Sequence, residues 1–67
     1  MIKILLNGQV YITNLNISIF DLLNFLMPRG SEVIVEYNHK IVFSENYKKI
    51  IIKDYDKIEL ITIVGGG

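Results

Sequence analysis

Apolar and polar residues alternate at the start of the chain in the pattern of a β-hairpin. Residues 2–6 form a short run of isoleucine and leucine around one lysine, Asn7-Gly8 follows, and residues 10–12 supply a second apolar run. Asn-Gly between two such runs is among the strongest short signals for a two-residue hairpin turn. Period-two alternation divides the first strand between two faces, with Ile2, Ile4 and Leu6 toward a core and Lys3 and Leu5 away from it.

The period changes to that of a helix after Asn14-Leu15-Asn16. Apolar residues then recur at i, i+3, i+4 and i+7, the spacing of one apolar stripe, at Ile19, Leu22, Leu23 and Leu26. Ser18 precedes the stripe as an N-cap, and Asp21 lies three residues later in the positive first turn. Pro28 and Gly30 end the helix.

Short strands and polar turns fill the second half of the chain. We expect strands over residues 33–37, 41–43 and 57–64, turns at 38–40 and 54–56, one helical turn at 44–47 and an extended piece at 50–52. In the last strand, alternation places Ile58 and Leu60 on one face and Glu59, Ile61 and Ile63 on the other. The predicted order is strand, strand, helix, strand, strand, turn, strand.

This order predicts an α+β protein with the β-grasp fold, which is ubiquitin-like. Two hairpins alone cannot bury the helix stripe, whereas a mixed sheet of four to five strands packed on one main helix can. We expect the last strand to lie between earlier ones, and Phe20 and Phe25, which fall off the stripe, to flank the core. The predicted domain covers residues 1–64, and residues 65–67 form a flexible C-terminal glycine tail.

Composition narrows the classes of function. Among 67 residues, seven basic and seven acidic side chains cancel and neither sign forms a run, which argues against a surface for nucleic acid or an anionic membrane. Cysteine is absent, so disulfides and thiolate metal sites are excluded. The apolar runs are too short for a membrane span or a secretory signal. We therefore expect a small core stabilised by packing, and partners that are proteins.

No group of side chains forms a convincing catalytic or metal site. His39, the one histidine, lies in a predicted polar turn beside Lys40 and has no neighbour for acid–base or metal chemistry. Asp54 and Asp56 alternate, with Glu59 three residues later, and could be read as cation ligands, but such a loop normally supplies more oxygen ligands and a glycine at its bend. Turn-forming aspartates are the simpler interpretation. We expect no catalytic residue, no metal and no bound cofactor.

The chain ends in three glycines, Gly65, Gly66 and Gly67, directly after an apolar strand. Because glycine has no Cβ, such a tail can thread a narrow slot and present the α-carboxylate of Gly67 to another protein's active site. This indicates a carrier and not an enzyme. The alternative is a frayed end or an expression scar, but the glycines follow Val64 with no structural stop between them.

The last strand also predicts a docking surface. Ile61 and Ile63 lie on the sheet face away from the helix, and Leu5 and Ile34 point the same way by the same alternation. Apolar residues gathered on one exposed face beside a tail are typical of a protein-binding surface. The alternative is that a loop or the chain's own neighbouring strand covers them.

These segments together resemble the ThiS family, the sulfur carriers of thiazole formation in thiamine biosynthesis. The similar segments are Asn7-Gly8 after the first strand, the capped helix start at 18–23, the hairpin of 33–38 and 41–42, the acidic turn at 54–59 and the end at 64–67. The resemblance covers nearly the whole chain. Two departures are Tyr55, where many members have glycine, and the third terminal glycine, where some members have two.

The resemblance implies a chemical cycle centred on Gly67. An E1-like adenylyltransferase of the ThiF type would use ATP to adenylate the Gly67 carboxylate, and a cysteine desulfurase would supply persulfide sulfur. The resulting thiocarboxylate would donate its sulfur to a thiazole synthase of the ThiG type. Val64, Gly65 and Gly66 would thread into the partners' active sites. The carrier would act as a protein co-substrate in the cytoplasm, or in the plastid stroma if an organelle encodes it.

Other small proteins share a di-glycine end. The small subunit of molybdopterin synthase uses the same thiocarboxylate but keeps a stable large-subunit partner. A ubiquitin-like protein modifier would join Gly67 to a lysine through an isopeptide bond. A plain interaction domain with an idle tail is a third alternative. The short length of the chain favours the thiamine carrier.

Overall fold

The computed structural model describes residues 1–63, and over this range the chain forms five strands, one α-helix and one 3₁₀ helix. In chain order they are β1 (Ile2–Leu6), β2 (Gln9–Thr13), α1 (Ile19–Leu26), β3 (Val33–Tyr37), β4 (Lys40–Val42), η1 (Ser44–Asn46) and β5 (Lys57–Thr62). The predicted α+β class and β-grasp order are confirmed. The expected domain boundary after Val64 lies outside the described residues.

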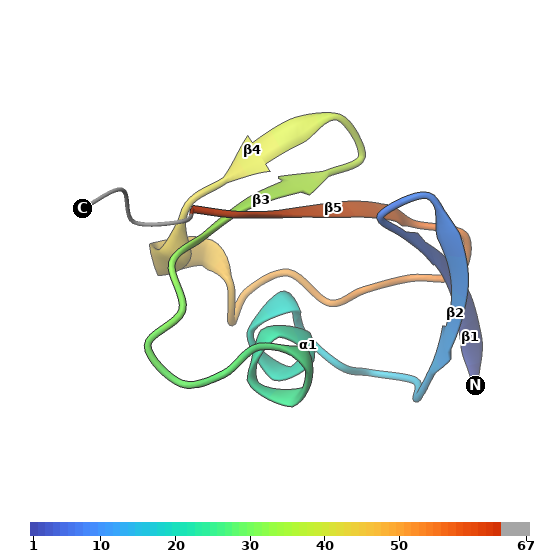
Figure 1. The fold of residues 1–67 in the computed structure, drawn as a ribbon. Coiled ribbons are helices and arrows are strands. Elements are labelled where there is room, and N and C mark those ends of the chain that lie inside the picture. Colours follow the sequence, from blue (N-terminus) through green and yellow to red (C-terminus); the bar gives the residue numbers. More distant parts are fainter. Residues whose placement is uncertain (64–67) are drawn as a thin grey trace.

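The strands form one mixed sheet in the order β2-β1-β5-β3-β4. The last strand, β5, runs parallel to β1 on one side and antiparallel to β3 on the other, so its expected central position is confirmed. Figure 1 shows α1 lying across one face of this sheet, with the end of β5 at the opposite end of the molecule from the chain's N-terminus. A central strand therefore leads directly toward the C-terminal residues.

Two-residue turns close both hairpins. Asn7 and Gly8 have φ of 49° and 80°, and Asn38 and His39 have φ of 49° and 72°, the left-handed values that a tight hairpin turn needs at both central positions. In the second hairpin, Tyr37 therefore pairs with Lys40. The predicted turn at 38–40 was one residue too long, and β4 begins and ends one residue earlier than expected.

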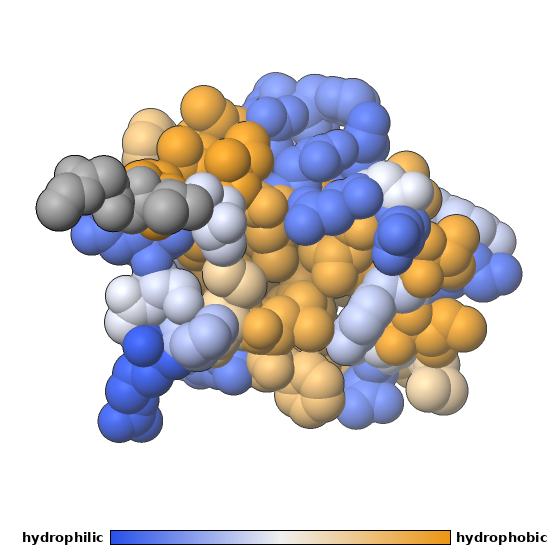
Figure 2. Space-filling view, in the orientation of Figure 1, coloured by the Kyte–Doolittle hydropathy of each residue, from blue (hydrophilic) through white to orange (hydrophobic). Residues whose placement is uncertain are grey.

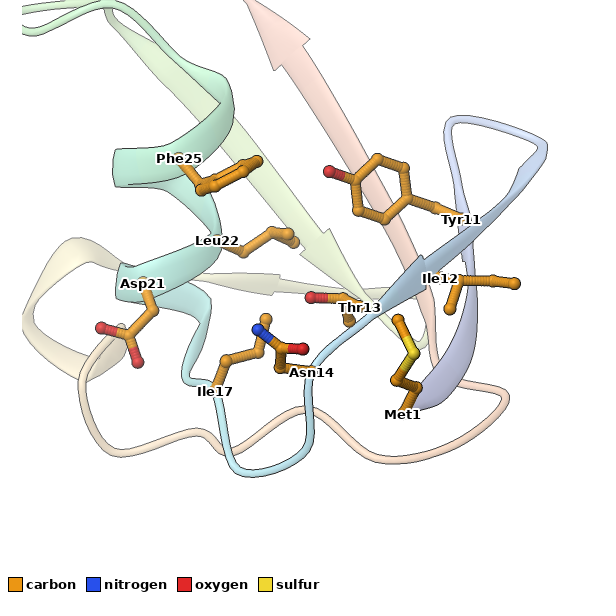
Figure 3. A pocket seen from close by; sticks show the side chains of 9 residues that line it. All are labelled: Met1, Tyr11, Ile12, Thr13, Asn14, Ile17, Asp21, Leu22 and Phe25. Atoms are coloured by element: carbon orange, nitrogen blue, oxygen red, sulfur yellow. The ribbon is translucent and has the colours of Figure 1, made fainter.

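A reciprocal pair of hydrogen bonds caps the start of α1. The Ser18 hydroxyl accepts from the Asp21 backbone N–H at 3.1 Å, and an Asp21 carboxylate oxygen accepts from the Ser18 N–H at 3.0 Å. The predicted N-cap is confirmed as a capping box. The expectation for Phe25 was wrong, because its side chain is 82% exposed. Figure 3 shows it projecting from α1 toward β2, where no further strand within residues 1–63 covers it.

The core lies between the inner face of the sheet and α1. Its buried residues are Ile2, Ile4, Ile19, Leu22, Leu23, Val35, Ile52 and Ile58. Of the inward positions that alternation predicted for β1 and β5, Ile2, Ile4 and Ile58 are buried, and Leu6 and Leu60 are half-buried against this core. The extended piece at 50–52 brings Ile52 into this core, because it forms backbone hydrogen bonds with residues 17–19 at the start of α1. The Ile19 N–H donates to the Ile50 carbonyl, and the Ile52 N–H donates to the Ile17 carbonyl. Within residues 1–63, no helix has the length and apolar character needed to cross a membrane.

Candidate functional site

The candidate site is the end of β5 with the outer sheet face beside it, because this strand leads to the terminal glycines. Val64, Gly65, Gly66 and Gly67 themselves lie outside the described residues. The last described residue, Ile63, continues the pairing of β5 beyond its end, because its N–H donates to the Glu32 carbonyl at 3.1 Å. The end of β5 is therefore hydrogen-bonded to the neighbouring chain as far as Ile63, the last described residue.

A side chain from the first turn supports the second half of β5. The parallel pairing with β1 ends at Leu6 and Ile58, which leaves the far end of β5 without a strand partner on that side among the described residues. The Asn7 side-chain oxygen accepts from the Leu60 N–H at 2.7 Å and takes the place of that partner. Asn7 thus both forms the hairpin turn and extends the ladder, and the sequence pattern predicted only the first role.

Asp56 organises the turn that precedes β5. Its side chain is nearly buried and accepts hydrogen bonds from the Tyr37 hydroxyl, the Asn38 side-chain amide at 3.1 Å and the Lys53 N–H at 2.7 Å. Asn38 in turn accepts from the Lys57 N–H at 2.8 Å. The turn interpretation of Asp56 is correct, and the structure adds that the same carboxylate ties the turn to β3. Burial of the phenol, together with its hydrogen bond to Asp56, raises the pKa of Tyr37 to about 12.

This network sets which residues of β5 lie beside which residues of β3 on the outer face. With the start of β5 fixed against β3, Ile34 pairs directly with Ile61. We name five residues the outer apolar cluster: Ile34, Ile41, Phe43, Ile61 and Ile63. Their side chains follow one alternation across β4, β3 and β5, and all are exposed. Figure 2 shows hydrophobic residues gathered at the upper left, over the ends of β4 and β5.

The structure brings together three of the four residues expected to form the docking surface. Ile34, Ile61 and Ile63 lie in the outer apolar cluster, whereas Leu5 pairs with Lys57 at the beginning of β5. Ile61 lies four positions after Lys57 in the extended strand, about 13 Å away at the usual rise. Leu5 is half-buried and lies beside Val10 of β2. It shares the outer face with the others but belongs to a separate apolar group.

Two carboxylates border the outer apolar cluster. Glu36 of β3 pairs directly with Glu59 of β5, and Ile41 of β4 lies on the other side of Glu36. Like charges directly opposite each other destabilise a sheet. The surface therefore combines apolar side chains with an acidic pair at its border, and this pair lowers the stability of the isolated fold. The hydrophobicity pattern did not predict this pair, because it depends on the register between strands far apart in the sequence.

The other candidate residues do not form a site within the described part of the chain. His39 is exposed in its hairpin turn. Asp54 accepts a hydrogen bond from the Lys3 N–H at 2.8 Å, while Asp56 points into the network described above. Over residues 1–63, no three histidine, aspartate or glutamate side chains gather in a geometry that could hold a metal ion.

A family comparison matches the same span of chain. The model of the ThiS family matches residues 4–67, so the match includes β5 and the terminal glycines. The chain belongs to the ThiS family. The resemblance to this family over nearly the whole chain is thereby confirmed.

Curated relatives fall into two groups. The chain is 47% identical over 62 residues to "Uncharacterized protein ycf40" of Trieres chinensis, covering 92% of this chain and 85% of that protein. It is 35% identical over 66 residues to the protein of the same name from Porphyra purpurea, with 98% and 93% covered. It is also 31% identical over 65 residues to the thiazole synthase of Paramagnetospirillum magneticum, where 97% of this ThiS-family chain matches 20% of a much longer protein.

A solved structure agrees with the fold. The thiamine biosynthesis protein ThiS from Geobacter metallireducens superposes with a TM-score of 0.83 at 26% identity, covering 98% of this chain and all of that one. The ThiS-type β-grasp fold thus extends over nearly the whole of both chains.

Proposed function

We propose that this protein is the sulfur carrier for thiazole formation in thiamine biosynthesis, with the Gly67 carboxylate as the site of sulfur attachment. One observation carries the proposal: the ThiS family match continues through residue 67, so the terminal glycines belong to the family pattern. The likeness to the thiamine biosynthesis protein ThiS over nearly the whole chain supports it further.

The proposed cycle begins with adenylation by an E1-like enzyme of the ThiF type. The Gly67 carboxylate attacks the α-phosphorus of ATP, releases pyrophosphate and becomes a mixed anhydride with AMP. A persulfide sulfur from a cysteine desulfurase then attacks the acyl carbon and displaces AMP. A thiol reductant supplies two electrons to cleave the remaining S–S bond, which leaves the thiocarboxylate. Adenylation is needed because a carboxylate is a poor electrophile, and the thiocarboxylate keeps a nucleophilic sulfur attached to the carrier.

Thiazole synthase of the ThiG type is the proposed sulfur acceptor. In a protein named thiazole synthase, one fifth of the length is similar to this chain. Joining two proteins in one chain raises their effective concentration for each other, and this arrangement is useful where the two act in consecutive steps. This favours thiazole synthase over a molybdopterin synthase large subunit as the partner of this carrier.

The outer apolar cluster is the proposed docking surface for these partners. Its five side chains are exposed beside the end of β5, so a partner that covers them also receives the residues that follow Ile63. The Glu36 and Glu59 carboxylates at its border favour a partner whose surface is apolar with a basic side chain at the edge. Val64, Gly65 and Gly66 would then pass into the partner's active site as a chain without bulky side chains.

In this role the protein is a co-substrate and not an enzyme. The activating enzyme binds the ATP, and the carrier holds no cofactor of its own. We propose the cytoplasm as its location, or the plastid stroma where an organelle encodes it.

The test is intact-mass analysis of the full chain after incubation with the activating enzyme, ATP and a cysteine desulfurase with cysteine. The expected result is a mass gain equal to the replacement of one oxygen atom by sulfur. A variant that lacks Gly67 is the matched control and should show no gain. An unchanged mass for the full chain would overturn the carrier assignment. Conjugates to other proteins in an extract would instead indicate a ubiquitin-like modifier.

Loaded carrier then separates the two sulfur pathways. It should lose its sulfur to thiazole synthase in the presence of that enzyme's other substrates. Transfer to a molybdopterin precursor with no transfer to thiazole synthase would favour the molybdopterin alternative.

A further inference from the structure

The open edge of the sheet at β2 differs in character from the open edge at β4. β2 has the sequence Gln-Val-Tyr-Ile-Thr, with neither a charge nor a proline. β4 has three residues and begins with Lys40. Natural proteins protect an exposed edge from pairing with another chain by making it short, charged or interrupted by proline. β4 carries two of these features and β2 carries none.

The backbone groups that β2 presents at this edge belong to Val10 and Ile12. These residues pair with Leu5 and Lys3 of β1. The Leu5 N–H donates to the Asp56 carbonyl at 2.9 Å, and the Lys3 carbonyl accepts from the Tyr55 N–H, so both β1 residues direct their backbone groups away from β2. In an antiparallel ladder, two opposite residues that do not hydrogen-bond to each other have their N–H and C=O groups directed away from the partner strand. The N–H and C=O of Val10 and Ile12 therefore point to the open edge.

From this geometry we propose that β2 pairs antiparallel with β2 of a second copy of this chain. A two-fold axis beside Tyr11 places Val10 opposite the second copy's Ile12, and Ile12 opposite the second copy's Val10. Each of these two pairs exchanges two backbone hydrogen bonds. The strand is self-complementary in this register, because no charge meets a like charge. The result is a continuous sheet of ten strands formed from two copies of the order β2-β1-β5-β3-β4.

Side chains beside this edge provide apolar area for the same contact. Val10 is 65% exposed and Ile12 is 56% exposed on the outer face. On the helix side, a cavity of about 220 Å³ lies between β2 and α1. Figure 3 shows Tyr11 and Phe25 projecting toward each other across it, with Leu22 below Phe25 on α1, and Ile12 turned to the opposite side of β2. A second copy at this edge would cover both groups, which explains why Phe25 remains exposed in one copy.

A second copy suits this edge better than a strand from a charged partner. A strand with charges would find no side chain of opposite sign on β2 itself, whereas a second β2 is neutral and has matching valine and isoleucine positions. The pairing also leaves the proposed function free to operate. The outer apolar cluster lies across β4, β3 and β5, on the other side of β1 from the paired edge. Because β2 strands pair antiparallel, the two β5 strands end at opposite ends of the joint sheet.

Sedimentation velocity and amide hydrogen exchange on the full chain test the pairing across a series of protein concentrations. The expected mass rises with concentration from the monomer value of 7.7 kDa toward twice that value. The Val10 and Ile12 amides should become protected over the same concentration range, whereas the Tyr11 amide, which faces β1, should be protected throughout. A monomer mass at every concentration, or unprotected Val10 and Ile12 amides in the dimer, would overturn the proposal.

Variants at the two edges provide the matched control. Val10→Pro removes an outward N–H without removing a bond to β1, and by symmetry it deletes two of the four intermolecular hydrogen bonds. We expect it to raise the dimer Kd about thirtyfold. Ile12→Lys should also prevent pairing, whereas Ile41→Lys on β4 should leave it unchanged. A dimer that survives both β2 variants, or that Ile41→Lys abolishes, would contradict pairing through β2. Amide spectra confirm that each variant is folded.

Discussion

The Tyr37 hydroxyl donates a hydrogen bond to the nearly buried Asp56 carboxylate and joins β3 to the turn that begins β5. The two residues are 19 positions apart in the chain. Their contact fixes where β5 starts against β3, and so determines that Ile61 comes to lie opposite Ile34. Which residues are neighbours on the outer face therefore depends on a polar contact on the inner side of the sheet.

This contact predicts a loss of stability at high pH. In the unfolded chain Tyr37 releases its proton near its ordinary pKa of 10.0, whereas the folded protein keeps the proton up to a pKa of about 12. The unfolded state therefore binds fewer protons between these two pH values. The stability that Tyr37 contributes is fully present below pH 10 and is lost as the pH rises toward 12. Denaturant titrations of the parent and Tyr37→Phe between pH 8 and 12 measure the effect.

The Tyr37→Phe comparison isolates this group from the other titrating residues. At neutral pH the variant should be less stable by about 1.5–3 kcal/mol, because it removes a hydrogen bond to a charged group. The difference between the two proteins should narrow above pH 10. Stability curves that remain parallel up to pH 12 would show that Tyr37 does not contribute to the alkaline transition.

Tyr55 provides a second prediction, through backbone strain. Its φ is 68°, in the left-handed region where a side chain costs about 1–2 kcal/mol and glycine costs little. Its ring is 78% exposed, so little packing is lost on substitution. We expect Tyr55→Gly to raise the free energy of unfolding by up to about 1 kcal/mol in urea titrations. Tyr55→Ala keeps the Cβ and should give no such gain; equal effects of both variants would argue against strain as the cause.

Glu36 and Glu59 predict a conflict between stability and binding. Neutralising either carboxylate should raise stability by about 0.2–1 kcal/mol, because the two lie directly opposite each other. The gain should shrink at high salt, and the double variant should add little to either single one. Glu36→Gln should also slow association with the activating enzyme, measured by surface plasmon resonance. Faster binding by the variant would contradict an acidic border that attracts the partner.

Ile61 tests the outer apolar cluster directly. The side chain is 48% exposed, so Ile61→Asp should cost no more than about 1 kcal/mol of stability. Its affinity for the activating enzyme should fall roughly tenfold or more, because an aliphatic side chain covered at an interface contributes about 1.5–3 kcal/mol. Leu15→Asp changes an exposed leucine in the loop between β2 and α1, and this control variant should bind normally. Marked unfolding of Ile61→Asp would show instead that Ile61 belongs to the core.

Gly66 tests the tail separately from the docking surface. Gly66→Val should leave the fold intact and abolish ATP–pyrophosphate exchange by the activating enzyme, because a branched side chain clashes in a slot shaped for glycine. Gly66→Ala, with a single methyl group, should lose less activity. Normal exchange with the valine variant would refute the proposed threading of the tail.

Local patterns in the sequence were sufficient to predict the elements of the fold. Asn7-Gly8 specified the first turn, Ser18 and Asp21 specified the start of α1, and the apolar stripe specified the helix face that is buried. Each of these depends on residues a few positions apart, whose spacing the chain itself fixes. The ThiS family resemblance rests on the same local segments, and the family comparison confirms it.

Tertiary structure decided what depends on contacts between distant strands. The register of β5 against β1 and β3 separates Leu5 from Ile61 and sets Glu36 opposite Glu59. The sheet order leaves Phe25 beside an open edge. Alternation along one strand gives the face of each residue but not its neighbours on the next strand, because a shift by two residues keeps every face and changes every pair. The sequence by itself thus determined the elements and their faces, and only the packed sheet determined which residues stand together on them.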